Sequence, residues 1–291
     1  MAATARRWID LHLHSTASDG KYAPSRVMEM AHARGLSAVA LTDHDTTDGV
    51  EEARQAAVRL GMEFVPGIEM EAVYGRHRLH ILGYYIDPTG SPFINALKGI
   101  VAKRHQRNEA IIERLRSMGI DIVYETVCER HPGSIIGRPH IADELIRLQA
   151  VSSFQQAFSK YLGNDAPAYV PRDAPSAANV IETIRAAGGV ASLAHPGRIT
   201  TTSHLELTTM IRDLCEAGLI GIETLHPDHN DATLKAMSDF ATRYDLCPTG
   251  GSDFHTLGTA VTRGVGFAKR RVHYELLERL REKRTKISNT V

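Results

Sequence analysis

The chain has 291 residues, 43% of them hydrophobic, which is enough for one large α/β barrel or for two domains. Its 34 basic and 34 acidic residues balance, so bulk charge gives no reason to expect binding to long duplex nucleic acid. No apolar run approaches the roughly 18 residues of a membrane span, and the three widely spaced cysteines exclude a disulfide framework, so we expect a soluble, cytoplasmic protein. The compositional anomaly is the histidine content, at 15 residues.

Short apolar runs alternate with helical patterns in the first part of the chain. This βαβα rhythm predicts parallel strands with helices on the outside. In the fourth strand the alternation places His80 and Leu82 on one face. We expect strands at 8–14, 37–42, 63–68 and 78–84, and helices at 26–34 and 49–60.

The rhythm breaks after Asp87 and Pro88. No convincing strand pattern interrupts residues 88–165, so we predict a helical insertion or cap there, flanked by barrel segments 1–87 and 166–291. The insertion should contain one long helix over 92–118 and two further helices near 139–148 and 153–162.

The strand–helix alternation then resumes and continues to the end of the chain, as expected for the second part of a barrel. We expect strands at 189–194, 219–224 and 246–250, helices at 175–187, 203–217 and 230–244, and a closing amphipathic helix over 274–283.

Imidazole and carboxylate groups recur where the expected strands end. Catalytic groups in α/β barrels lie at the carboxyl ends of the strands, so these side chains should meet in one place. Mixed histidine and carboxylate ligands without thiolate suit Mn, Fe or Zn, and a carboxylate can bridge two metals. A single histidine of this kind is more often structural, but the conjunction indicates a multinuclear metal centre. The residues are His12, His14, Asp43, His44, Glu69, His80, His195, Asp253 and His255.

At these positions the chain resembles the PHP (polymerase and histidinol phosphatase) family. The resemblance implies a distorted (β/α)7 barrel with a helical insertion and a site for two or three divalent metals. The matching segments are Asp10-Leu11-His12-Leu13-His14-Ser15, Ser18-Asp19-Gly20, Leu41-Thr42-Asp43-His44-Asp45, Pro66-Gly67-Ile68-Glu69, Ala194-His195-Pro196 and Gly251-Ser252-Asp253-Phe254-His255.

The resemblance also implies roles for individual residues. Mn²⁺ is the first choice of metal, with Fe²⁺ or Zn²⁺ as alternatives. If no third metal binds, the three residues implied as its ligands, Asp19, His44 and His255, would instead hold phosphate or supply the catalytic proton. Asp43 and Glu223 are expected to support ligands rather than to bind metal. The implied ligands are His12, His14, Glu69 and Asp253 for the first metal, Glu69, His80 and His195 for the second, and Asp19, His44 and His255 for the third.

Two segments of the expected insertion are candidates for substrate binding. Lys103, Arg104 and Arg107 are neighbours on one helix, and the alternative is a solvated basic face. Arg138 and Pro139 stand at a predicted helix start, whose free N–H groups can bind an anion. The alternative is a capped helix start with a solvent-exposed arginine. Ser134 and His140 would add hydrogen bonds. Two anion sites favour a substrate with two phosphates or a nucleotide with a second charged end.

Within the family, the insertion resembles that of stand-alone 3′,5′-nucleoside bisphosphate phosphatases. We therefore expect a phosphoric monoester hydrolase that removes the 3′-phosphate from nucleoside 3′,5′-bisphosphates, through a hydroxide that bridges two metals. The enzyme alternatives are a 5′→3′ exonuclease on short RNA and a histidinol-phosphate phosphatase, whose cationic substrate would prefer carboxylates in the insertion. A non-catalytic metal-binding module is the alternative of another class.

Overall fold

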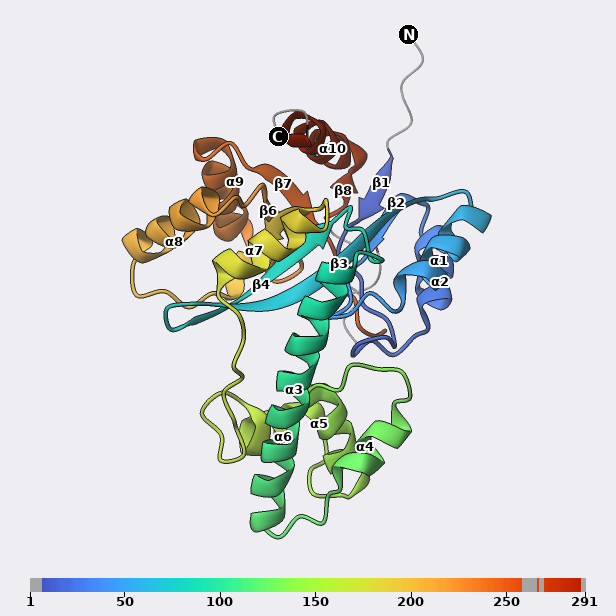
Figure 1. The fold of residues 1–291 in the computed structure, drawn as a ribbon, viewed down its shortest axis with the longest axis vertical. Helices are drawn as coiled ribbons and strands as arrows, with labels where there is room; N and C mark the ends of the chain where they lie inside the picture. The colour runs from blue at the N-terminus through green and yellow to red at the C-terminus, as the bar shows by residue number, and fades with distance from the viewer. Residues whose placement is uncertain (1–6, 258–265, 267–269, 289–291) are drawn as a thin grey trace.

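The fold is described from a computed structural model, which covers residues 7–257, 266 and 270–288. One sheet contains all eight strands of the described chain, and helices surround it (Figure 1). The strands are β1 (Trp8–Asp10), β2 (Leu36–Leu41), β3 (Glu63–Tyr74), β4 (His77–Tyr84), β5 (Val190–Leu193), β6 (Gly221–Leu225), β7 (Cys247–Gly250) and β8 (Val272–His273).

The helices fall into two groups, one around the sheet and one in the segment between β4 and β5. Around the sheet lie α1 (Pro24–Ala33), α2 (Val50–Arg59), α7 (Ala177–Ala186), the short 3₁₀ helix η2 (Pro196–Arg198), α8 (His204–Glu216), α9 (Asp231–Arg243) and α10 (Tyr274–Ser288). The intervening segment holds α3 (Ser91–Ser117), α4 (Tyr124–Arg130), α5 (Arg138–Arg147), α6 (Phe154–Ala157) and the π-helix η1 (Phe158–Leu162).

The sheet is a nearly closed barrel, as expected from the sequence. Its strand order is β7-β6-β5-β4-β3-β2-β1-β8. The two sides meet where Leu11 N–H donates to the carbonyl of Gly250 at 3.2 Å, and where Leu13 forms a parallel bridge with Phe254. The strands are buried on both faces, which explains their continuous apolar runs. This closure brings the two ends of the barrel sequence, with their histidines, to one rim.

The parallel arrangement predicted for residues 78–84 is wrong. Strand β4 is antiparallel to both of its neighbours, β3 and β5. Only Gly75 and Arg76 connect β3 to β4, with Gly75 at a φ of 55°. A parallel pair needs a crossover of a dozen or more residues, so this two-residue turn requires a hairpin.

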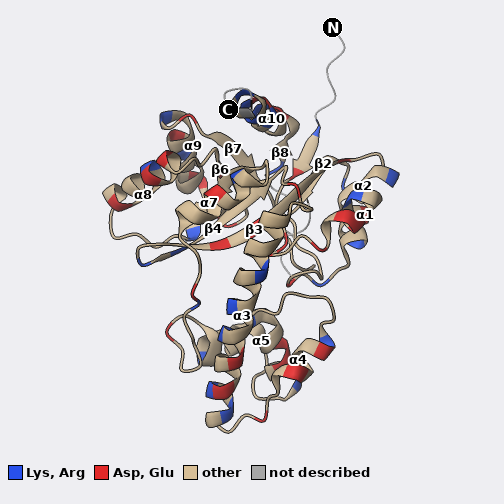
Figure 2. Ribbon diagram, in the orientation of Figure 1, with Lys and Arg blue, Asp and Glu red and all other residues tan. Residues whose placement is uncertain are grey.

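The segment between β4 and β5 forms a helical lobe on one side of the barrel (Figure 1). It has an apolar core of its own, which includes Ile111, Leu115, Ile141 and Leu145. No strand occurs among residues 88–165, all of which the structure describes. Figure 2 shows basic residues along the part of α3 nearest the barrel, so the lobe presents positive charge toward the barrel rim.

Across the described ranges, none of the helices combines the length and apolar character needed to cross a membrane.

Candidate metal centre

Four ligand atoms converge at the end of β1. The Nε2 atoms of His12 and His14 both lie 3.3 Å from Glu69 Oε2, and they lie 3.4 and 3.2 Å from Asp253 Oδ1. His12 Nε2, His14 Nε2 and Glu69 Oε2 are buried and form no hydrogen bond. Orphaned buried polar atoms are costly, and their convergence is what a bound cation requires. The donor set therefore fits a divalent metal.

Glu69 lies at the centre of a second group of ligands. Its Oε2 is 3.1 Å from His44 Nδ1, and its Oε1 is 3.0 Å from His80 Nδ1 and 2.9 Å from His195 Nε2. Burial alone would raise the pKa of Glu69, but His44 and His12 outweigh it and hold that pKa well below its usual range. The carboxylate is therefore ionised, and its two oxygens face two different sets of histidines, as a bridging ligand would.

A third group lies next to the first. His255 Nε2 is 3.2 Å from Asp19 Oδ1, and His44 Nε2 is 4.0 Å from Asp19 Oδ2. His14 completes this group. The structure thus brings together all nine residues that the sequence analysis proposed as ligands, and it places His14 and His44 between two groups each.

A cavity of about 350 Å³ opens above these ligands. Its metal-facing wall includes His44, His80 and His195 from the barrel. The helical lobe contributes the lining residues Arg104, Arg107, Arg138, Pro139 and Phe158.

Similarity to known proteins extends over most of the chain. The family model described as PHP domain matches residues 10–166, which is more than half of the chain. The chain belongs to the PHP domain family. It is 36% identical over 258 residues to the 3′,5′-nucleoside bisphosphate phosphatase of Chromobacterium violaceum, covering 86% of this chain and 88% of that protein. It is 35% identical over 246 residues to a 5′-3′ exoribonuclease of Haemophilus influenzae, covering 84% and 89%.

A solved structure has the same fold as this PHP protein. A Bifidobacterium adolescentis protein described as a metal-dependent phosphoesterase superposes with a TM-score of 0.84 at 30% identity, covering 95% of this chain and 96% of that one. The family, the relatives and the three ligand groups identify the chain as a metal-dependent phosphoesterase, and so as a hydrolase. The expected fold class, an α/β barrel of PHP type with a helical insertion, is confirmed.

Carboxylates behind the ligands hold them in position. Glu223 on β6 places Oε1 3.1 Å from His12 Nδ1 and accepts the backbone N–H of His195 through Oε2 at 2.7 Å. The Nδ1–H of His12 therefore points to Glu223, and Nε2 is left for the metal. Asp43 accepts hydrogen bonds from the hydroxyls of Ser15 and Ser18, both at 2.6 Å, and so fixes the loop between His14 and Asp19.

Asp253 is held by two residues with no role in the sequence-based site. Arg198 Nη1 donates to its Oδ2 at 2.7 Å, and His226 Nε2 lies 3.4 Å from the same oxygen. Asp253 and His195 adopt φ angles of 51° and 27°, which are strained for non-glycine residues and typical of functional positions. These contacts aim Oδ1 of Asp253 at His12 and His14. No sequence pattern points to the contact of His226 with Asp253, because it depends on the fold.

The structure separates the six expected substrate residues into two sets. Arg104, Arg107 and Arg138 line the cavity, but Lys103, Ser134 and His140 do not. Lys103 lies on the exposed side of α3, where its ammonium pairs with Asp173 at 2.5 Å.

The other two excluded residues have structural partners. Ser134 donates its hydroxyl to the carbonyl of Thr16 at 2.6 Å. His140 Nδ1 accepts the backbone N–H of Gly137 at 2.9 Å and so caps the start of α5.

A buried ionic network joins the lobe to the barrel. Asp45 is fully buried, contacts Arg104, and accepts from Arg172 Nη1 at 2.8 Å. Arg172 Nη1 also donates to Glu71 Oε2 at 2.7 Å. The sequence pattern missed this network, since Arg172 lies in a segment without regular structure, far along the chain from Asp45.

We expect Asp45→Asn to lower the free energy of unfolding by about 2 kcal/mol. The substitution leaves Arg104 and Arg172 buried without their shared carboxylate, while Glu71 still compensates Arg172. Urea denaturation measures the change. The matched control is Asp173→Asn, which removes an exposed partner of Lys103 and should leave the midpoint unchanged. Equal midpoints for the Asp45 variant and the unmodified protein would contradict the assignment.

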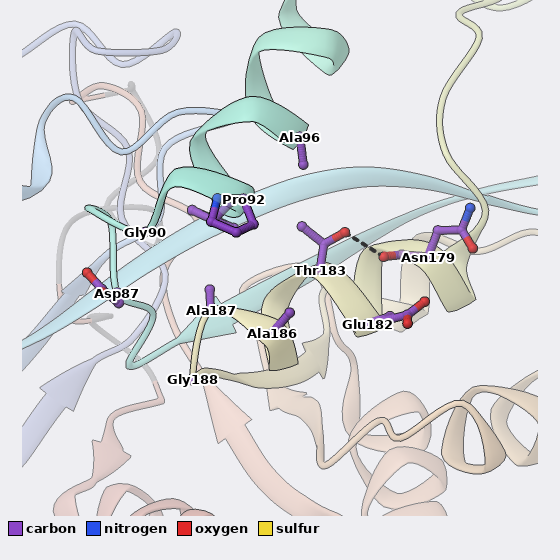
Figure 3. Close-up of a pocket in the computed structure, with 11 residues that line it drawn as sticks. Asp87, Gly90, Pro92, Ala96, Asn179, Glu182, Thr183, Ala186, Ala187 and Gly188 are labelled. Atoms are coloured by element: carbon purple, nitrogen blue, oxygen red, sulfur yellow. Dashed lines mark hydrogen bonds between the residues drawn. The ribbon is translucent and has the colours of Figure 1, made fainter.

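A larger cavity of about 670 Å³ lies elsewhere, between the start of α3 and the end of α7 (Figure 3). Its ionisable lining residues are Asp87 and Glu182. The Asp87 carboxylate accepts hydrogen bonds from Thr89, and Thr183 donates to the carbonyl of Asn179. This cavity brings together no set of metal ligands and no cations, so it is not the site of the chemistry.

Proposed function

We propose that this PHP phosphoesterase removes the 3′-phosphate from nucleoside 3′,5′-bisphosphates and uses Mn²⁺, with Fe²⁺ or Zn²⁺ as alternatives. The observation that carries the proposal is Arg107. Its side chain is 8% exposed, lines the cavity, and forms no hydrogen bond or ion pair with another described residue. Burial and the neighbouring Arg104 lower the pKa of Arg107 to about 9, which still leaves it charged at neutral pH.

Glu71 offsets part of this charge but less than Arg104 adds to it, so a buried cation that no ion pair holds is available to an anion from outside the protein. Arg138 faces the same cavity, and within the described part of the chain its guanidinium donates to neutral acceptors alone, the carbonyl of Leu162 at 3.0 Å and the Asn164 side chain at 3.2 Å. Two cations that form no ion pair with a described carboxylate therefore line the same cavity as the metal ligands. This arrangement favours a substrate with one phosphate at the metals and a second phosphate at Arg107 and Arg138.

Divalent metals held by these ligands would supply a nucleophile at neutral pH and neutralise charge on the phosphoryl group. The protein's own residues orient the substrate. Arg107 and Arg138 hold the 5′-phosphate, which fixes the 3′-phosphate above Glu69. If no third metal binds, His255, which lines the cavity 3.2 Å from Asp19, is placed to hold a proton for the leaving 3′-oxygen, whereas burial lowers the pKa of His44 to about 3 and leaves that imidazole neutral.

A 5′→3′ exonuclease on short RNA is the second candidate. The Haemophilus influenzae exoribonuclease is about as similar to the chain as the bisphosphate phosphatase. A 5′-phosphate at the end of RNA would meet the same two arginines. A histidinol-phosphate phosphatase fits less well, because Arg107 and Arg138 would repel a cationic amine.

The test compares substrates on manganese-loaded protein. Adenosine 3′,5′-bisphosphate should be hydrolysed with a kcat/KM about 100-fold above that of adenosine 3′-monophosphate, which lacks the second phosphate. A series of 5′-phosphorylated oligoribonucleotides of increasing length is the comparison. Faster release of 5′-nucleotides from these oligomers than of phosphate from the bisphosphate would overturn the proposal in favour of the exonuclease. Faster hydrolysis of histidinol phosphate would also overturn it.

A further inference from the structure

The residues that the barrel contributes to the cavity are all ionisable, but the lobe also supplies an apolar surface. Of the described residues that line the cavity, Pro139 and Phe158 are apolar, and every other one is an aspartate, glutamate, arginine or histidine. Phe158 is half-buried and packs on one side against the core of the lobe. An aromatic ring that lines a cavity offers a face on which a planar group of a ligand can stack.

Local backbone structure fixes the position of this ring. Phe158 begins the π-helix η1, and π-turns are rare and frequent at functional sites. The turn closes where Gly163 N–H donates to the carbonyl of Phe158 at 2.7 Å. A Cβ at Gly163 would lie 2.7 Å from that same oxygen, so the turn requires glycine there. The expected uninterrupted helix over 153–162 is therefore divided, and the wider turn begins at Phe158.

The ring lies next to a cation of the proposed phosphate site. The Arg138 guanidinium carbon is 5.7 Å from the centroid of the Phe158 ring and 5.6 Å from that of Tyr169. An anion at Arg138 would thus sit beside an aromatic face. Nucleotides carry a phosphate and a planar base on the same ribose, so their shape matches this pair of features.

We propose that Phe158 is the stacking platform for the substrate's nucleobase and so a specificity-determining residue. The inference rests on the proposed function and deepens it, because a platform for a base selects nucleotides over phosphorylated sugars that carry the same phosphates. Stacking on an aromatic side chain accepts any base, since every base has a π-face.

The experiment measures the binding of AMP and of ribose 5-phosphate to manganese-loaded protein by calorimetry. Phe158→Leu keeps an apolar side chain but removes the ring. We expect about 10-fold weaker binding of AMP and unchanged binding of ribose 5-phosphate. Phe158→Trp should restore AMP binding. The matched control is Phe154→Leu, at a more exposed phenylalanine of α6 that does not line the cavity, and it should change neither affinity.

Two results would overturn the platform. Equal weakening of AMP and ribose 5-phosphate would show that Phe158 only shapes the Arg138 site, and unchanged AMP binding would show that the ring does not contact the base. Hydrolysis of adenosine 3′,5′-bisphosphate by the unmodified protein tests the underlying function separately. Selective loss of AMP binding in a protein that does not hydrolyse the bisphosphate would support the platform and reject the proposed function.

Discussion

Glu69→Gln should lower kcat/KM by at least about 10³-fold, the largest effect we expect from any single substitution. Both carboxylate oxygens of this buried residue face histidines, three at Oε2 and two at Oε1. Glutamine keeps the shape but replaces one oxygen with an NH₂ group, which cannot bind a cation. It also removes the negative charge that the surrounding ligand groups share.

Metal content separates this explanation from a general loss of structure. Elemental analysis should find less metal per chain in the Glu69 variant, and added Mn²⁺ should raise its melting temperature less than that of the unmodified protein. Glu51→Gln is the control, because Glu51 is an exposed carboxylate on α2 that contacts only residues of its own helix. A Glu69 variant with full metal content and full activity would exclude a bridging role.

Arg107→Met should raise KM for adenosine 3′,5′-bisphosphate about 100-fold and also raise the melting temperature of the free protein. The first effect follows from the loss of a desolvated cation that meets the second phosphate. The second follows because methionine fills the space without a buried charge that burial and Arg104 disfavour and that no ion pair holds. Opposite changes in stability and substrate affinity are typical of a residue retained for binding.

Steady-state kinetics with two substrates and a thermal melt test this prediction. KM for adenosine 3′-monophosphate, which lacks the 5′-phosphate, should change little. Arg116→Met, at an exposed position of the same helix α3, should change neither KM nor the melting temperature. An equal rise of KM for both substrates would place Arg107 at the metal-bound phosphate instead.

The sequence predicted the barrel and the approach of its ligands because both depend on local patterns. Histidines and carboxylates directly follow short buried strands, and barrel closure then brings strand ends together whatever the loop lengths. The hairpin of β3 and β4 was missed because strand propensity does not depend on strand direction. The direction follows instead from the two-residue turn at Gly75, which is too short for a parallel connection.

Contacts that span long stretches of chain were harder to predict. Arg172 meets Asp45, and Arg198 meets Asp253, through segments without periodicity. Of the three α3 cations proposed from the sequence, Arg104 and Arg107 line the cavity and Lys103 does not, since spacing along a helix identifies neighbours but not which of them faces the barrel. Arg107 and Lys103 share a helix face by that criterion, yet only Arg107 lines the cavity.

The separate apolar core of the helical lobe has an evolutionary consequence. Because Ile111, Leu115, Ile141 and Leu145 pack among themselves rather than with the barrel, substitutions in the lobe can accumulate without disturbing the ligands of the metals. One scaffold can therefore acquire new substrates by remodelling a single module, provided that Asp45 keeps its contact with Arg104. The relatives of this chain are named for different substrates, as expected if the barrel holds the metals and the lobe selects the substrate.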